Sequence, residues 1–160
     1  MNKKLIALSV AGLLSTSVFA DNYAGVSYKM VEIEAGSSSV EPSALEGKYG
    51  SFLTNNFALE GRLGFGIADD EGVDIDSLLG VFGAFHFMPK EKFSPYALIG
   101  YSRGEISAGS FSDSETDISF GFGADIAVNG DGAFNVEYVQ YLDKDGVTIS
   151  ALSAGYVWNF

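Results

Sequence analysis

The segment "FALEGRLGFGI", residues 57–67, decides how this chain folds. Its large apolar side chains fall on alternate positions, and the positions between them hold Ala, Glu, Arg and Gly. Alternation with a period of two is the pattern of a β-strand with two unlike faces. One face is apolar, and the other carries the charged residues Glu60 and Arg62. The two faces of this strand must therefore meet different surroundings.

The same alternation recurs along the chain, as in "DISFGFGADIAV" (117–128), "GAFNVEYVQYL" (132–142) and "ALSAGYVWNF" (151–160). It predicts an all-β chain without a helix of useful length. Eight strands are expected, with the approximate ranges 23–33, 44–53, 57–67, 77–88, 94–106, 116–128, 133–142 and 147–160. In the fifth of these, "PYALIGYSRGEI" leaves open which side chains face which way.

Turn signals separate the predicted strands and are of two kinds. Tight turns are expected at 54–56, 89–92 and 129–132. Longer or more acidic connections are expected at 34–42, 68–76, 107–115 and 143–146. The two kinds alternate along the chain. This is the arrangement of an antiparallel up-and-down barrel, in which successive connections lie at opposite ends.

The first 20 residues have the composition of a secretory signal peptide. Lys3 and Lys4 precede a short apolar run, and the small residue Ala20 marks the expected cleavage site. The apolar run is too short to span a bilayer as a helix. We therefore predict a signal peptide over 1–20 and one domain over 21–160.

Net charge and cysteine content exclude two classes of protein. Without Lys3 and Lys4, the domain has 7 basic against 21 acidic residues, a net charge of −14. Such a surface repels nucleic acid, whose binding depends on neutralising phosphates. The sequence has no cysteine, so an exported disulfide scaffold is also excluded.

The composition of the minor face decides which way the barrel faces. Gly, Ser and Ala are interleaved there with charges, and such residues do not make a dry hydrophobic core. They suit the narrow polar interior of a membrane barrel, whose outer face is apolar. The candidate interior charges are Glu46, Lys48, Glu60, Arg62, Asp125 and Glu137. We predict an eight-stranded antiparallel transmembrane β-barrel whose interior charges pair across strands and fill the lumen.

The last residues carry a further signal. Tyr156, Trp158 and Phe160 lie on the apolar side of the final strand, where an aromatic belt meets the membrane interface. An ending of this type resembles the C-terminal signal of Gram-negative outer-membrane barrels, which the barrel-assembly machinery recognises. The resemblance implies that these three residues act in assembly.

Residues 21–160 resemble the small eight-stranded outer-membrane proteins of the OmpA/OmpX type, a porin-like barrel family. The resemblance rests on the architecture, the ending "GYVWNF", "SPYALIGYSRG" and the charged interior. It implies a monomer in the bacterial outer membrane, with both termini periplasmic and the acidic connections outside. The implied partners are membrane lipids, lipopolysaccharide and the assembly machinery. The outer connections are shorter than those of adhesive members, which weakens an adhesin interpretation.

No catalytic, cofactor or metal site is predicted. The only histidine, His86, lies in "GAFHFMP", where Met88 stands in place of the Ser of the deacylase-type His-x-Ser motif. The Gly-rich pieces lack phosphate-loop spacing. "DKDG" at 143–146 has only a fragment of a calcium-loop pattern, and a hairpin turn explains it more simply. A loose divalent-cation site among the acidic connections, bridging to lipopolysaccharide phosphates, stays open, but a solvated acidic rim is the simpler interpretation.

The sequence therefore predicts a non-catalytic outer-membrane protein with a structural, envelope-integrity or surface-interaction role. Two alternatives stay open. One is a narrow ion-conducting channel, and the other is a periplasmic lipid-binding barrel with its apolar face inside.

Overall fold

The computed structural model describes residues 21–160, so the predicted signal peptide lies outside the described residues. The strands are β1 (Asn22–Ala35), β2 (Ser38–Val40), β3 (Ser43–Phe52), β4 (Phe57–Ala68), β5 (Val73–His86), β6 (Phe93–Ala108), β7 (Phe111–Asn129), β8 (Gly132–Lys144) and β9 (Val147–Asn159). Over this range the structure contains no helix long and apolar enough to cross a membrane.

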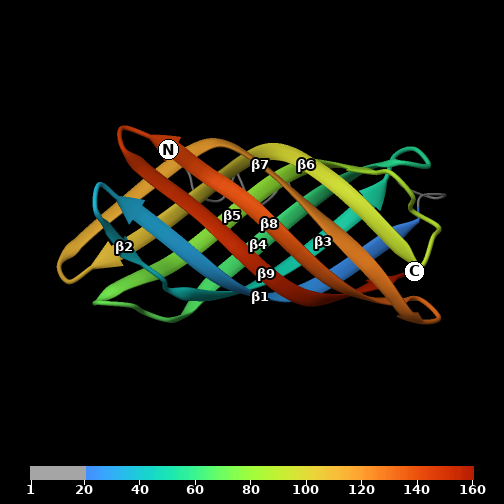
Figure 1. The fold of residues 1–160 in the computed structure, drawn as a ribbon, viewed down its shortest axis with the longest axis horizontal. Coiled ribbons are helices and arrows are strands. Elements are labelled where there is room, and N and C mark those ends of the chain that lie inside the picture. The colour runs from blue at the N-terminus through green and yellow to red at the C-terminus, as the bar shows by residue number, and fades with distance from the viewer. Residues whose placement is uncertain (1–20) are drawn as a thin grey trace, which may run out of the picture.

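The strands form one closed antiparallel barrel (Figure 1). Each strand pairs with the next around the sheet, and β1 also pairs with β9 over Tyr23–Ala35. The seam extends to the last residue of the chain. The amide of Phe160 donates to the carbonyl of Asn22 at 2.8 Å, and the amide of Asn22 donates to the carbonyl of Phe160 at 3.0 Å. Closure pairs the first barrel strand with the last, so the sheet lacks the two free edges that an open sheet would have.

The nine strand elements make eight barrel strands, because β2 and β3 follow one another along the same side of β1. They are separated at Glu41 and Pro42. Pro42 has no amide hydrogen to donate, but its carbonyl accepts from the amide of Val31 at 3.0 Å. The predicted eight-stranded antiparallel up-and-down barrel is confirmed.

The two faces of β4 show which side chains point outward and which point into the lumen. Leu63 is 44% exposed on the outer surface, whereas Arg62 is 4% exposed and points inward. The orientation of β6, which the sequence left open, is settled in the same way: Tyr96 and Leu98 face the lumen, and Tyr101 faces outward. Around the barrel, large apolar side chains form an exposed outer belt.

The two ends of the barrel differ. The terminal end holds Asn22, Phe160 and the turns at 53–56, 87–92 and 130–131. The acidic end holds the turns at 36–37, 69–72, 109–110 and 145–146.

The connections at the acidic end differ from the longer loops that the sequence predicted. Strand pairing continues through most of 34–42 and 107–115, and β6 and β7 stay paired as far as Ala108 and Phe111. Gly36, Gly109 and Gly146 have positive φ, which permits two-residue turns there. At the tips of these strands, as over 111–116 of β7, both faces are exposed to water, so the apolar alternation that identifies strands is lost.

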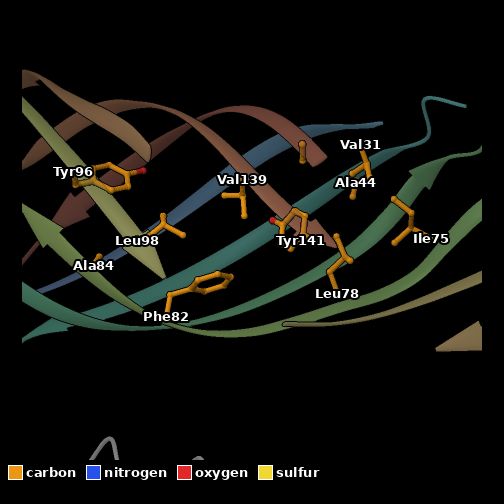
Figure 2. Close-up of a cluster of buried hydrophobic side chains, with 11 residues drawn as sticks. Val31, Ala44, Ile75, Leu78, Phe82, Ala84, Tyr96, Leu98, Val139 and Tyr141 are labelled. Atoms are coloured by element: carbon orange, nitrogen blue, oxygen red, sulfur yellow. The ribbon is translucent and has the colours of Figure 1, made fainter. Parts of the chain in front are cut away.

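The interior also differs from the uniformly polar lumen that we predicted. A cluster of buried apolar side chains points into the barrel from opposite walls (Figure 2). Its larger members are Val31, Ile75, Leu78, Phe82, Tyr96, Leu98, Val139 and Tyr141. Register shifts between Ile75 and Ser77 and between Gln140 and Leu142 explain part of the difference. A bulge places two residues opposite one and thereby changes which parity faces inward.

A charge on the outer belt tests its contact with lipid. Leu63→Arg should lower the free energy of unfolding by about 2–4 kcal/mol, because it places a charge at membrane depth. Ser112→Arg, on the outer surface at the acidic end, should change it by less than about 0.5 kcal/mol. Urea unfolding from phospholipid vesicles measures both. Equal losses would show that the belt does not face the hydrocarbon.

Candidate functional site

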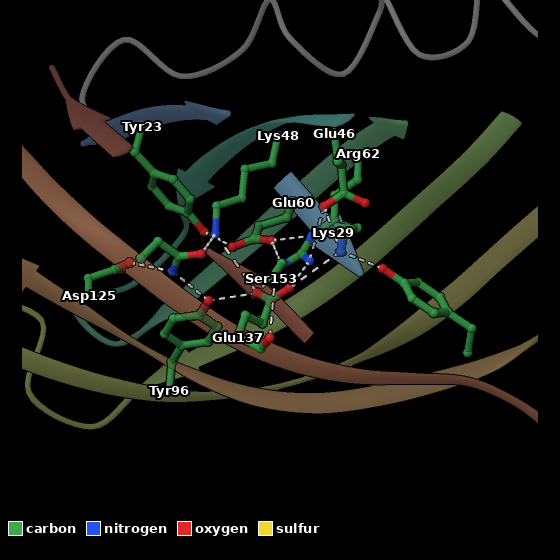
Figure 3. Close-up of polar contacts among 12 residues, drawn as sticks. Tyr23, Lys29, Glu46, Lys48, Glu60, Arg62, Tyr96, Asp125, Glu137 and Ser153 are labelled. Carbon is green, nitrogen blue, oxygen red and sulfur yellow. Dashed lines mark hydrogen bonds and ion pairs between the residues drawn. The ribbon is translucent and has the colours of Figure 1, made fainter. Parts of the chain in front are cut away.

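Arg62 lies at the centre of a buried ion-pair network inside the barrel (Figure 3). Its guanidinium is 2.5 Å from Glu60 Oε2, 2.5 Å from Glu137 Oε1 and 3.6 Å from Glu46 Oε1. Glu137 is on β8, which stands four strands from β4 in either direction around the eight-stranded barrel. The contact between Arg62 and Glu137 therefore spans the lumen.

The geometry of this contact uses the fork of the guanidinium. Nη1 of Arg62 donates to Glu137 Oε1 at 2.5 Å, and Nη2 donates to Glu137 Oε2 at 2.8 Å. Nε donates to Glu60 Oε2 at 2.8 Å, and the Phe82 ring centroid lies 4.8 Å from Cζ. Bidentate pairs of this kind are stronger and more directional than single contacts.

Two lysines complete the balance of charge. Lys29 Nζ lies 3.1 Å from Glu46 Oε1 and donates to the Tyr141 hydroxyl at 2.6 Å. Lys48 Nζ lies 3.8 Å from Glu137 Oε2 and donates to Asn135 Oδ1 at 3.3 Å. With Arg62 these lysines supply three positive charges, which match the three carboxylates of the network. Balance matters because an unpaired buried charge is costly.

Two tyrosines orient the carboxylates. Tyr23 donates to Glu60 Oε1 at 2.5 Å, and Tyr96 donates to Glu137 Oε2 at 2.6 Å. Each tyrosine lies over a glycine that is its direct cross-strand partner: Tyr23 over Gly50 and Tyr96 over Gly123. A Cβ atom at either glycine would overlap the tyrosine ring. Glycine at these positions thus makes room for the ring that holds the carboxylate.

The structure brings five of the six candidate interior charges into direct ion pairs, namely Glu46, Lys48, Glu60, Arg62 and Glu137. Asp125 is only partly buried and joins through Asn135, whose Nδ2 donates to it at 2.7 Å. Lys29 is fully buried in the network, although it was not among the candidate interior charges. It could have been identified from "YAGVSYKM", because it lies two residues from Ser27 and therefore on the same, polar face of the strand.

The network crosslinks strands through paired charges. Each of its carboxylates contacts a cation, and the three cations are held by carboxylates, a phenol or an amide. No cluster of three or more His, Asp or Glu side chains suited to a metal ion is present in residues 21–160.

His86 lies at the terminal end of the barrel, beside the two tyrosines of the network. Its ring packs 4.9 Å from that of Tyr96 and 5.0 Å from that of Phe52. Nδ1 is 3.5 Å from Ser94 Oγ, and Nε2 has no hydrogen-bond partner within the described part of the chain. A Ser–His pair becomes a nucleophile when a third group orients the imidazole. Because Nε2 has no partner and the Ser94 contact is long, the arrangement is that of a packed aromatic side chain.

The C-terminal aromatics lie on the outer surface at the terminal end. The rings of Tyr156 and Trp158 are 4.9 Å apart, and Phe134 packs 5.6 Å from Tyr156. The Tyr156 hydroxyl donates to Asn129 Oδ1 at 3.3 Å. Phe160 is 68% exposed, so its side chain contributes little to packing inside the barrel.

Removing Arg62 tests the network. Arg62→Met should lower the free energy of unfolding by about 3–5 kcal/mol, because it leaves buried carboxylates without their cation. Adding Glu137→Gln to this variant should recover part of the loss. Urea unfolding from phospholipid vesicles measures these differences.

The matched control is Arg103→Met. Arg103 pairs with Glu105 at 3.5 Å, but the two side chains are 51% and 48% exposed. An exposed pair of this kind contributes about 0–1 kcal/mol. A loss for Arg62→Met no larger than that for Arg103→Met would contradict the structural role of the network.

Comparisons with known proteins agree with this geometry. The profile of the family described as outer membrane protein beta-barrel domain matches residues 5–160. Comparison with curated proteins gives no match. Among solved structures, Neisserial surface protein A is 18% identical with a TM-score of 0.67, and the match covers 87% of this chain and 97% of that one.

Two further barrels are similar. Ail, the attachment invasion locus protein of Yersinia pestis, is 18% identical with a TM-score of 0.67 and coverages of 88% and 99%. The N-terminal barrel of Pseudomonas aeruginosa OprF is 16% identical with a TM-score of 0.64 and coverages of 88% and 99%. At these identities the likeness shows the fold.

The apolar outer face, the charged interior and the family match all indicate that the barrel lies in a membrane. The predicted bacterial outer-membrane location and the OmpA/OmpX-type architecture are confirmed, and a periplasmic lipid-binding barrel does not fit them. This chain belongs to the outer membrane protein β-barrel domain family.

Proposed function

We propose that this protein is a non-catalytic, monomeric barrel that supports the outer membrane and closes its own lumen to ions. One observation carries the proposal: the bidentate contact between Arg62 and Glu137 joins opposite walls of the barrel. A group that bridges the lumen in this way lies on any path through the barrel.

The dimensions of the barrel support the same conclusion. Eight strands enclose a space that side chains just fill, whereas aqueous channels need about 16 strands. Here the ion-pair network and the neighbouring apolar side chains fill this space together: the Phe82 ring lies 4.8 Å from Arg62 Cζ, and Val139 is fully buried beside them. An ion crossing the barrel would have to break buried charge pairs and pass between apolar side chains.

The acidic end is the part of the barrel that would face outward if both termini are periplasmic. Its carboxylates are Glu32, Glu34, Glu41, Asp69, Asp70, Glu71, Asp74, Asp76, Glu105, Asp113, Glu115, Asp117, Asp143 and Asp145. Against them stand only Arg103 and Lys144. Such a surface would favour cationic partners and repel polyanions.

The charge of the acidic end can be compared with the ligand of one structural neighbour. Ail was solved in complex with sucrose octasulfate, a heparin analogue. A polyanion of that kind has no complementary surface at the acidic end of this barrel. We therefore assign the protein a structural role rather than one in binding sulfated polysaccharides.

Conductance in planar bilayers tests the closed lumen. The wild-type barrel should show no unit conductance above the membrane background. Arg62→Ser combined with Glu137→Ser should open a leak, because it truncates the side chains that bridge the lumen.

Arg103→Ser with Glu105→Ser, which truncates an exposed pair on the outer surface, serves as the control and should stay silent. Steady conductance steps in the wild-type protein would instead favour the narrow ion channel.

We also propose that Tyr156, Trp158 and Phe160 form the assembly signal. The roles of the Phe160 backbone and side chain can be tested separately. The backbone pairs with Asn22 and closes the barrel, whereas the side chain is exposed. Phe160→Ala should therefore fold normally in detergent and shift on SDS gels when boiled. In cells it should accumulate severalfold less folded protein in the outer membrane.

A matched substitution is Phe93→Ala, another exposed outer phenylalanine at the terminal end. It should assemble at nearly the wild-type level. If Phe160→Ala assembled equally well, the side chain would have no role in recognition.

A further inference from the structure

A cavity of about 240 Å³ lies inside the barrel at the acidic end. Apolar side chains from five strands line it, among them Val31 of β1, Leu78 of β5, Ile106 of β6, Tyr141 of β8 and Ile149 of β9. We call it the outer cup. The Tyr141 hydroxyl accepts a hydrogen bond from Lys29, so the cup ends where the ion-pair network begins. Asp145 also lines the cup and belongs to the turn at 145–146, so the entrance of the cup lies at the acidic end.

One wall of the cup is acidic. Asp113, Glu115 and Asp117 alternate along β7 on the same side as the buried Ser119, so all three carboxylates line the cup. Unlike the carboxylates of the network, they make no ion pair with Lys or Arg in the described part of the barrel. A fourth carboxylate, that of Asp145, also lines the cup, and Lys144 is the single basic residue in its lining. The wall thus carries an excess of negative charge.

These two features define the chemistry of a ligand. The apolar surface favours a hydrocarbon or aromatic body, and the carboxylates favour a positive charge while repelling anions. The side chains do not converge on a metal ion, because alternate residues of a strand are about 6.6–6.8 Å apart. The cup is smaller than the roughly 300–1,000 Å³ of sites for drug-sized ligands.

We propose that the outer cup binds small organic cations that carry an apolar body. The body would rest on Val31 and Leu78, and the ammonium group would lie against Glu115 and Asp117. Binding would occur from the acidic end alone, because the network closes the cup below.

Four probes separate the contributions. Phenethylammonium combines a positive charge with an apolar body, and 2-phenylethanol has the same body without the charge. Spermidine and Mg²⁺ carry charge without an apolar body of that kind. Amide chemical shifts of the isotope-labelled barrel in detergent micelles report affinity and location. Phenethylammonium should bind at least tenfold more tightly than each of the others, with the largest shifts near Ile106 and Ile149.

Variants locate the site. Glu115→Gln with Asp117→Asn should weaken phenethylammonium binding about tenfold, the order expected for two exposed charge pairs. The control, Asp69→Asn with Glu71→Gln, removes equal charge from the acidic end outside the cup and should change binding less than twofold. Gly104→Leu, which adds a side chain inside the cup, should abolish binding.

Several results would overturn the proposal. Equal binding of 2-phenylethanol would remove the role of charge, and equal binding of spermidine or Mg²⁺ would remove that of the apolar body. Equal losses in the two charge variants would indicate a diffuse attraction to the acidic end. Wild-type affinity in a folded Gly104→Leu barrel would place the ligand elsewhere. The charge variants alter exposed or half-exposed side chains, so they decide the question even if Gly104→Leu folds poorly.

Discussion

The rest of this structure depends on how the charge of Arg62 is compensated inside the barrel. A guanidinium removed from water costs several kcal/mol unless carboxylates meet it with good geometry. Glu60 and Glu137 provide that geometry from the same strand and from the opposite wall. Tyr23 donates to the remaining oxygen of Glu60, and Tyr96 donates to Glu137 Oε2, which also accepts from Arg62. One buried cation thus determines which residues four other positions can hold.

The requirement extends from charge to backbone shape. A tyrosine ring reaches a carboxylate in the crowded lumen only where the neighbouring strand has no side chain, as at Gly50 and Gly123. The high glycine content of this chain therefore has a specific use at these positions. Glycine normally weakens a strand, and here aromatic rings cover the exposed backbone and offset part of that cost.

The sequence predicted the strands well where one face met lipid and the other met the lumen. Alternation is strong there, and "FALEGRLGFGI" alone identifies both faces of β4. It failed at the strand tips of the acidic end, where both faces meet water and the strands continue without an apolar pattern. It also missed the inward-facing Ile75 and Leu142, because register shifts lie beside both residues. Lys29 was within reach, since its parity matched that of the inner face. The partner of each interior charge could not be predicted, because contacts such as that between Arg62 and Glu137 join residues 75 positions apart in the sequence.

The distribution of charge separates residues that hold the barrel together from those available to other molecules. Inside the membrane-spanning part, Arg62, Lys29 and Lys48 each meet a carboxylate, as burial demands. At the acidic end no such demand applies, because water solvates the carboxylates. A strong excess of one sign there raises the folding cost through self-repulsion and adds nothing to packing. Because this excess of negative charge does not stabilise the fold, we interpret it by the cations that it attracts. The unpaired carboxylates around an apolar cavity are therefore the part of this barrel where interaction with other molecules should be sought.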